Sequence, residues 1–387
     1  MISIRECISE SDLLTAREQH ISFISKEVKK RVDFYKNLFE TIQLTHQGKI
    51  EDDDIENNIK KIKLHHSQYD SFIKVIFKDN KSVDKKYKKL KNKSLFREEL
   101  KDFKKVLKIL NDLHTNCRRI LGLDLSSNEE DIVLYKKYEE KYRNYKILLN
   151  KIFDYENWFQ KITPEKEWGP YQLTKKLGIQ VCCYCNRQYT FTLSKGVKKI
   201  TRPELDHFLP KSKHPLLALN FFNLIPSCSV CNRDCKGTVD FSYEKYLSPY
   251  ESNPKHQLIK YDYKPETYLG AIGKTDEIKV FTKINEENED QRLQEKVKGN
   301  IKVFEYNKIA NEHRDIVQEI IKKRCIFNDK YIETLQQAFP DIHLTLEEAY
   351  QLAYGNFYDE KEFTKRPLAK LTKDIAVATG VIKNKIS

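Results

Sequence analysis

The first 163 residues of this 387-residue chain lack proline, and they hold only two of its eleven glycines, Gly48 and Gly122. Both residue types interrupt helices, so their scarcity excludes frequent turns in this region. Charged residues alternate there with Ile, Leu, Phe and Tyr at helical spacing. This pattern predicts an all-helical region with breaks near the two glycines. The expected helices cover residues 10–46, 53–78, 94–121 and 128–160.

Long apolar runs are also missing. No stretch approaches the roughly 18 uninterrupted apolar residues of a membrane-spanning helix, and the first residues lack the apolar core of a secretion signal. We therefore expect a cytoplasmic protein that spans no membrane. Acidic residues are in deficit, with 57 Asp and Glu against 70 Lys and Arg, which leaves a net charge of +13 and a pI near 9.0. This excess favours an anionic partner, nucleic acid before a membrane surface.

Nine cysteines are present, an odd number in a lysine-rich chain without a secretion signal, which favours metal binding over disulfides. Two pairs have Cys-x-x-Cys spacing, which lets both thiolates of a tight turn reach one tetrahedral zinc ion. We expect a closed structural site, and the long interval between the pairs implies that it clamps an inserted element. Buried unrelated thiols are the alternative, and Cys183 or Cys235 could substitute for one ligand. The predicted zinc ligands are Cys182, Cys185, Cys228 and Cys231.

The composition changes near residue 163, because prolines begin at Pro164 and nine of the eleven glycines lie from Gly169 onward. We predict an α+β fold that is mostly helical. Strands are expected over residues 188–193, then through a turn at 194–196 to a second strand ending at 206, with later strands at 257–263 and 277–283 and helices at 298–338 and 345–355. The expected domains are a helical region 1–163, a central module 164–245, and a mixed, mainly helical region 246–387.

Asp206 and His207 close the second expected strand. Taken alone, such a pair is more often structural than catalytic. Adjacent strand residues point to opposite faces, so the two side chains cannot share one metal from a regular strand. We interpret the pair as a division of labour, with one residue binding metal and His207 handling protons, because the unperturbed pKa of histidine lies near neutral pH. An amide oxygen at Asn232 is able to complete an oxygen site with Asp206.

The order Asp206-His207, then Asn223-Leu224, then Cys231-Asn232 with a lysine close behind resembles the HNH endonucleases, the ββα-metal nucleases, over roughly residues 182–240. The resemblance implies that His207 activates water and that Asp206 and Asn232 hold a catalytic ion. It also implies that Asn223 pins the loop that aims His207. Oxygen ligands favour magnesium or manganese. The family usually places the lysine three residues after the Asn, whereas Lys236 lies four after it.

The cationic residues around this module predict contacts with phosphates and salt-sensitive binding, to DNA first and RNA as an alternative. Because Lys236 is displaced from the family position, Arg233 is an alternative phosphate contact. A lysine-rich stretch at 81–93 is either a second contact or a solvated helix face. The candidate nucleic-acid contacts are Lys199, Arg202, Lys211, Lys213, Arg233 and Lys236.

The large helical extension without a chemical motif resembles the HNH subunits of bacterial anti-phage systems of the Septu type, and the segment Phe363–Leu371 is similar to the end of such proteins. This resemblance implies an SMC-like or ABC-type ATPase as partner. No complete Walker-type phosphate loop occurs, so ATP use would belong to another chain. The helical region could instead serve dimerisation. The rival functions are a zinc-dependent nucleic-acid-binding subunit without catalysis and an interaction scaffold.

Overall fold

The computed structural model describes residues 1–50, 96–251, 258–285, 290–326 and 345–380, together with the single positions 334 and 337. The helix expected at 53–78, the lysine-rich stretch 81–93 and most of 327–338 lie outside the described residues. Within the described ranges, helices predominate and the strands form three two-stranded sheets, so the predicted α+β, mostly helical class is confirmed. The chain divides into two compact units, one of Arg17–Ile162 with Leu209–Leu224 and one of Met1–Ala16, Thr163–Phe208 and Ile225–Ser387.

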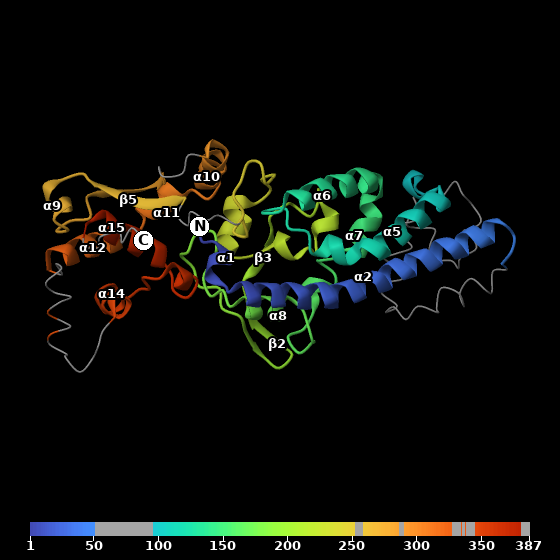
Figure 1. Ribbon diagram of the computed structural model, residues 1–387, viewed down its shortest axis with the longest axis horizontal. Coiled ribbons are helices and arrows are strands. Elements are labelled where there is room, and N and C mark those ends of the chain that lie inside the picture. The colour runs from blue at the N-terminus through green and yellow to red at the C-terminus, as the bar shows by residue number, and fades with distance from the viewer. Residues whose placement is uncertain are drawn as a thin grey trace. The chain divides into compact units, whose positions relative to one another are not determined.

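The first of these, the helical unit, contains most of the long helix α2 (Glu10–His46) (Figure 1). Apolar residues at three- and four-residue spacing along α2, among them Ile24, Val28, Val32 and Tyr35, are buried, as expected for one apolar stripe. The unit also contains η3 (Glu98–Leu100), α5 (Phe103–Leu121), α6 (Glu129–Tyr142), η4 (Arg143–Tyr145), α7 (Lys146–Ile152), η5 (Phe159–Lys161), η6 (Pro215–Leu217) and η7 (Phe221–Asn223).

Local signals explain where these helices begin and end. The helix α2 covers the predicted residues, and α5 ends at the predicted break because Gly122 follows it. However, α5 begins nine residues later than predicted, because the Asp102 carboxylate caps it by accepting from the Lys105 N–H at 3.1 Å. The prediction of one continuous helix over residues 128–160 is wrong, because α6, η4, α7 and η5 share this range. Tyr142 stacks on Tyr138 and donates to Asp112 at the point where the chain tightens into η4.

The second unit, here the sheet-bearing unit, holds all three strand pairs. Strands β5 (Ile259–Pro265) and β6 (Ile278–Ile284) pair antiparallel from Ile259 opposite Ile284 to Pro265 opposite Ile278, close to the predicted ranges. In Figure 1, β5 lies across α12 and α15, and Ile278, Val280, Ile320 and Ile375 are among the residues of their shared core. The helices of this unit are α1 (Ile4–Cys7), α8 (Pro170–Leu177), α9 (Tyr268–Ala271), α10 (Gln291–Val303), α11 (Tyr306–Asn311), α12 (Arg314–Ile326), α14 (Leu346–Tyr354), η9 (Glu360–Glu362) and α15 (Ala369–Ala378).

The central hairpin differs from the prediction. Strands β1 (Leu193–Lys195) and β2 (Lys198–Thr201) pair antiparallel about a turn at Gly196, whose φ of 55° suits glycine. The predicted turn at 194–196 is therefore displaced, because residues 194 and 195 belong to β1. Pro203 interrupts the predicted second strand before residue 206, because proline has no N–H to donate to a neighbouring strand. The next strand, β3 (Glu204–His207), pairs instead with β4 (Leu224–Ser227).

No helix among the described residues combines the length and the apolar character that crossing a membrane requires. The tripeptide Gly273-Lys274-Thr275, which ends the phosphate loop of many ATPases, follows α9 and precedes β6 here. It is therefore not the strand-to-helix turn that a phosphate loop needs.

Candidate functional site

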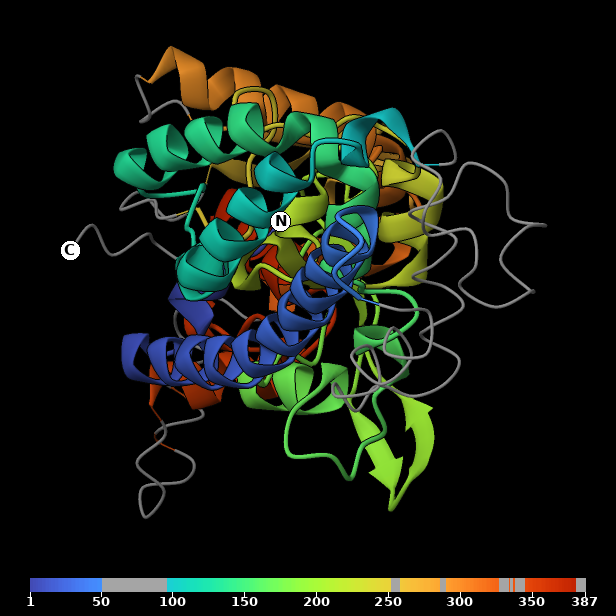
Figure 2. The same cartoon turned by 90° about the vertical axis from the view of Figure 1, so that its right-hand side faces the viewer.

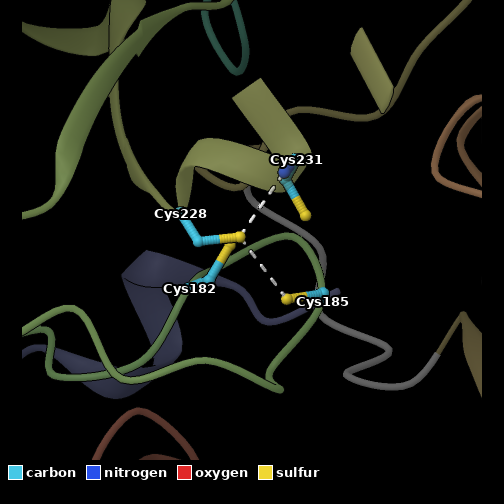
Figure 3. Close-up of side chains that lie close together, drawn as sticks. All are labelled: Cys182, Cys185, Cys228 and Cys231. Atoms are coloured by element: carbon cyan, nitrogen blue, oxygen red, sulfur yellow. Dashed lines mark hydrogen bonds between the residues drawn. The ribbon is translucent and has the colours of Figure 1, made fainter. Parts of the chain in front are cut away.

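The four predicted cysteines come together in the sheet-bearing unit (Figure 3). All four are buried, and their Sγ atoms lie within 4.8 Å of one another, with 4.0 Å between those of Cys185 and Cys228. Sulfur atoms at ~2.3 Å from a tetrahedral zinc ion are about 3.8 Å apart, so the cluster fits zinc with little adjustment. Cys183 and Cys235 are not members of this group.

Backbone hydrogen bonds shape both cysteine turns. The Arg187 N–H donates to Cys185 Sγ at 3.4 Å, and the Cys231 N–H donates to Cys228 Sγ at 3.4 Å. Such bonds stabilise thiolates, which are the forms that bind metal. Hydrogen bonds from the neighbouring thiols, that of Cys182 first, hold the pKa of Cys185 well below its ordinary value. The two thiols that accept backbone hydrogen bonds, Cys185 and Cys228, are thus the ones most readily present as thiolates.

The first cysteine turn also anchors the late segment that the sequence singled out. Asn186 lies in the left-handed region, with a φ of 50°, which places its amide group toward residues 363–370. Its Nδ2 donates to the Phe363 carbonyl at 2.7 Å, and its Oδ1 accepts from the Lys370 N–H at 3.0 Å. The Leu368 N–H donates to the Asn186 carbonyl at 2.6 Å. The segment thus packs on the first cysteine turn.

Strands β3 and β4 and the short π-helix η8 (Val230–Lys236) follow one another as a strand, strand, helix element. Cys228 and Cys231 lie at the start of η8, so the cysteine cluster fixes this end of the element. Glu204 and Asp206 occupy alternate positions of β3 and therefore share one face. Asn232 and Lys236, one helical turn apart on η8, contact this face.

Asp206 lies at the centre of a buried network. Its two oxygens accept from Lys236 Nζ at 2.7 and 2.9 Å, and Oδ2 also accepts from the Tyr184 hydroxyl at 2.7 Å. Lys236 Nζ further donates to the His207 carbonyl and lies 4.8 Å from the centre of the Phe241 ring. Both Lys236 and Asp206 are at most 4 % exposed. A buried ion pair of this kind is tolerated only where both charged groups also have hydrogen-bond partners, as Asp206 and Lys236 have here.

The second pair on this face joins Asn232 to Glu204. Asn232 Nδ2 donates to Glu204 Oε2 at 2.8 Å, and the exposed Arg233 guanidinium pairs with Oε1 of the same carboxylate. Glu204, Asp206 and Asn232 are hard oxygen donors, so their chemistry fits magnesium or manganese. An ion at Asp206 has to replace the Lys236 ammonium. Among the described residues, no group of three His, Cys, Asp or Glu ligands includes Asp206.

His207 and Asn223 belong to different units. His207 is buried and ends β3 on the face opposite Asp206. In the helical unit, Asn223 Oδ1 accepts from the Leu209 N–H at 2.7 Å, and its Nδ2 donates to the carbonyls of Leu209 and Leu217 at 3.1 and 3.0 Å. Asn223 thus fixes the backbone two positions after His207 in the chain. That this fixes the aim of His207 stays a prediction.

The candidate nucleic-acid contacts are distributed over both units. Lys199 lies on the exposed strand β2, and Arg202 lies directly after it. Desolvation lowers the pKa of Lys199, and the nearby charge of Arg202 lowers it further. In the helical unit, Lys213 is exposed and Lys211 pairs with Glu156 at 3.0 Å. Lys236 is buried, so the structure places it on Asp206 rather than on the surface.

Sequence reasoning missed two residues of this element, Tyr184 and Glu204. Glu204 could have been inferred from the sequence, because residues two apart on a strand share a face and Glu204 precedes Asp206 by two positions. Tyr184 has no such signal, since it reaches Asp206 only through the folding of the first cysteine turn. The Tyr306 hydroxyl holds that turn by donating to the Tyr184 carbonyl at 2.7 Å.

Comparison with known proteins relates part of the chain to one of them. Over 60 residues the chain is 40% identical to a Septu protein PtuB of Bacillus thuringiensis. The match covers 16% of this chain and 23% of that protein, so the chain spans less than a quarter of the length of the relative that it matches. No family model and no solved structure matches the chain. A cysteine cluster suited to zinc and a partial similarity to a Septu protein thus stand together in one chain.

Proposed function

We propose that the chain is an HNH endonuclease that hydrolyses phosphodiester bonds of DNA as a cytoplasmic effector of a Septu-type anti-phage system. One arrangement carries the proposal, namely the pair β3–β4 followed by η8, with Asp206 and His207 on opposite faces of β3. The cysteine cluster clamps this element, which supports a structural role for zinc. The similarity to Septu protein PtuB supports the defence role. An SMC-like or ABC-type ATPase is the partner of this proposal.

In this proposal His207 is the general base. It removes a proton from water while the water oxygen forms a bond to phosphorus and the bond from phosphorus to the leaving oxygen breaks. Asp206 and Asn232 would hold magnesium or manganese, which when bound stabilises the charge that develops on the leaving oxygen, an effect of several kcal/mol. Asn223 keeps the backbone after His207 in place. Lys199, Arg202, Lys211, Lys213 and Arg233 contact phosphates.

A His207→Ala variant tests the proposal. We expect loss of at least ~100-fold in the rate of plasmid nicking in magnesium, since general base catalysis contributes 10²–10⁴-fold. Zinc content and the circular dichroism spectrum should stay unchanged, because only the side chain beyond Cβ is removed. The His114→Ala variant, which changes a half-buried histidine of α5, is the control and should cut as the wild type does. Unchanged cleavage by a folded, zinc-loaded His207→Ala protein rules out this mechanism.

A binding subunit without catalysis is the second candidate. The observation that favours it is the Lys236 ammonium, which already neutralises Asp206 without any added ion. RNA in place of DNA is an alternative substrate for either candidate. The binding subunit predicts retained nucleic-acid affinity with no nicking of DNA or RNA in magnesium or manganese, whether or not an ATPase partner is present. Nicking by the purified wild type that disappears in His207→Ala excludes it.

A further inference from the structure

The hairpin β1–β2 and the residues that lead into it carry exposed apolar side chains to which the catalytic proposal gives no role. All seven residues of the two strands are exposed. The hairpin is the pair of yellow-green strands in Figure 2. Large apolar side chains are exposed with them, at 50 % for Tyr189, 41 % for Phe191 and 51 % for Leu193. Val197 and Ile200 are exposed at 60 % and 56 %. Such a concentration of exposed apolar side chains on a small element indicates a binding surface.

Two of these side chains are aromatic rings already arranged as a platform. The rings of Tyr189 and Phe191 stack with their centres 4.6 Å apart and an angle of 23° between their planes. Stacked, exposed aromatic rings interact with nucleic-acid bases without regard to sequence, because every base has a flat π-face. The pair therefore fits an unpaired base better than a base held within a duplex.

The charge around the platform has one sign. Between residues 187 and 203 the chain has five cationic residues and no acidic one. Lysine is depleted in the cores of protein–protein interfaces, whereas a cationic groove with aromatic rings is the usual surface for single-stranded nucleic acid. The cationic residues are Arg187, Lys195, Lys198, Lys199 and Arg202.

The base of the hairpin is firmly attached to the zinc-binding turn. Val181 and Tyr189 form a β-bridge, the Cys182 N–H donates to the Gln188 carbonyl at 3.0 Å, and the Thr190 N–H donates to the Gln180 carbonyl at 2.7 Å. At its other end the hairpin continues through Pro203 directly into β3. The hairpin is thus attached through backbone hydrogen bonds to the first cysteine turn, and through the chain itself to β3, the strand that carries Asp206.

We propose that Tyr189 and Phe191 stack on unpaired bases while the hairpin cations hold the adjoining phosphates, so that the substrate is single-stranded or locally opened nucleic acid. The inference deepens the proposed nuclease function and rests on it for the identity of the substrate. It assigns the hairpin a role in selecting strand form, separate from the hydrolysis that Asp206 and His207 would carry out.

Binding is measured by fluorescence anisotropy in a His207→Ala background, so that no strand is cut. The probes are labelled oligothymidine and the same strand annealed to oligodeoxyadenosine. A Tyr189→Ala, Phe191→Ala double variant should bind oligothymidine at least ~5-fold more weakly, since base stacking contributes about 1–3 kcal/mol per base. Its affinity for the duplex should change less. The Tyr268→Ala variant on α9, which changes an even more exposed aromatic side chain, is the control and should bind as the parent does.

A Tyr189→Leu, Phe191→Leu variant keeps an apolar surface but removes the flat rings. Weakened binding to oligothymidine in this variant supports stacking, and unchanged binding overturns it. Equal weakening for both probes, or loss of self-association in place of nucleic-acid binding, also overturns the proposal. This test is separate from the test of the nuclease proposal. If the wild type binds oligothymidine through these rings but cuts no nucleic acid, the role of the hairpin stands and the nuclease proposal fails.

Discussion

At the scale of single residues, Lys236 decides most about the site. Its ammonium holds both oxygens of Asp206 and the His207 carbonyl, in the position where a bound cation is expected from the family resemblance. The sequence placed this lysine one position later than the family does. The additional residue on η8, a π-helix, lets the side chain turn inward onto β3. A divalent cation at Asp206, as the proposed function requires, would therefore compete with Lys236.

A Lys236→Met variant should make stability dependent on metal. Removing one partner of a buried ion pair costs about 3–5 kcal/mol because it leaves the other charge unpaired. We expect a lower melting temperature without added metal and a larger recovery with magnesium or manganese than the wild type shows, measured by thermal unfolding. Lys296→Met, which breaks the buried pair with Glu251, is the control and should show no recovery. Equal metal effects in all three proteins contradict the competition.

At the scale of elements, two turns and two short strands carry the site. The first cysteine turn holds Tyr184 against Asp206 and Asn186 against the segment after Phe363, and the second begins η8. Zinc at the cluster would thus tie both partners of Asp206, Tyr184 and Lys236, to one ion. Loss of the ion should loosen the whole element, because structural zinc binding is coupled to folding.

A Cys228→Ser variant should lose its zinc and part of its stability together. We expect less than one zinc per chain by atomic absorption and a melting temperature lower by several degrees. Cys235→Ser, which changes a cysteine outside the cluster, should keep one zinc per chain and is the matched control. Full zinc content in Cys228→Ser would show that the four-cysteine assignment is wrong.

His20 on α2 should make the helical unit sensitive to acid. Its Nε2 lies 2.8 Å from the Leu219 carbonyl and its ring packs edge-on against Phe159 and Phe221, and burial lowers its pKa to about 4. Because the folded-state pKa lies below the unfolded value of 6.5, the neutral ring stabilises the fold above pH 6.5. This stability, at most about 3 kcal/mol, is lost as the pH falls toward 4.

Denaturant unfolding of wild type and His20→Phe between pH 7 and pH 4 checks this. The free energy of unfolding should fall less steeply with acidification in the variant, which keeps an aromatic ring but carries no titratable nitrogen. His114→Gln, at a half-buried position of α5, is the control and should keep the wild-type slope. Parallel pH profiles for wild type and His20→Phe contradict the assignment.

At the scale of the whole molecule, the excess of cationic over acidic residues is the main guide to the partner. The net charge of +13 favours nucleic acid, and the predicted phosphate contacts lie on both units. Lys199 and Arg202 belong to the sheet-bearing unit, whereas Lys211 and Lys213 belong to the helical unit. Binding that uses both units should therefore depend strongly on salt.

The affinity for labelled DNA should fall steeply between low and physiological salt, because each neutralised phosphate contributes about −0.9 to the slope of log affinity against log salt. Lys199→Gln with Arg202→Gln should make that slope shallower by about 2. Lys308→Gln, an exposed lysine of α11 that pairs with Glu305, is the control. A slope that the double variant leaves unchanged excludes these two residues from phosphate contact.

Local patterns were sufficient for several elements. The ends of α2, the break at Gly122 and the pair β5–β6 follow from periodicity and glycine placement, which act over a few residues. The start of α5 was displaced because the Asp102 cap outweighed the apolar pattern, and the second predicted strand was interrupted because Pro203 lies within it. The exposure of Tyr189 and Phe191 was not foreseen, because alternation along a strand says which side chains share a face but not whether anything covers it.

The sequence by itself determined the composition-level properties of this protein: its mostly helical α+β class, its cationic charge and the two cysteine pairs that define a metal-binding cluster. These depend on spacing and residue type, which local chemistry governs. Only the tertiary structure decided what the cluster holds together. The contacts of Tyr184, Asn232 and Lys236 with β3 join residues about twenty or more positions apart, and such pairs form only when the chain packs. The pairing of Lys236 with Asp206 arises from that packing.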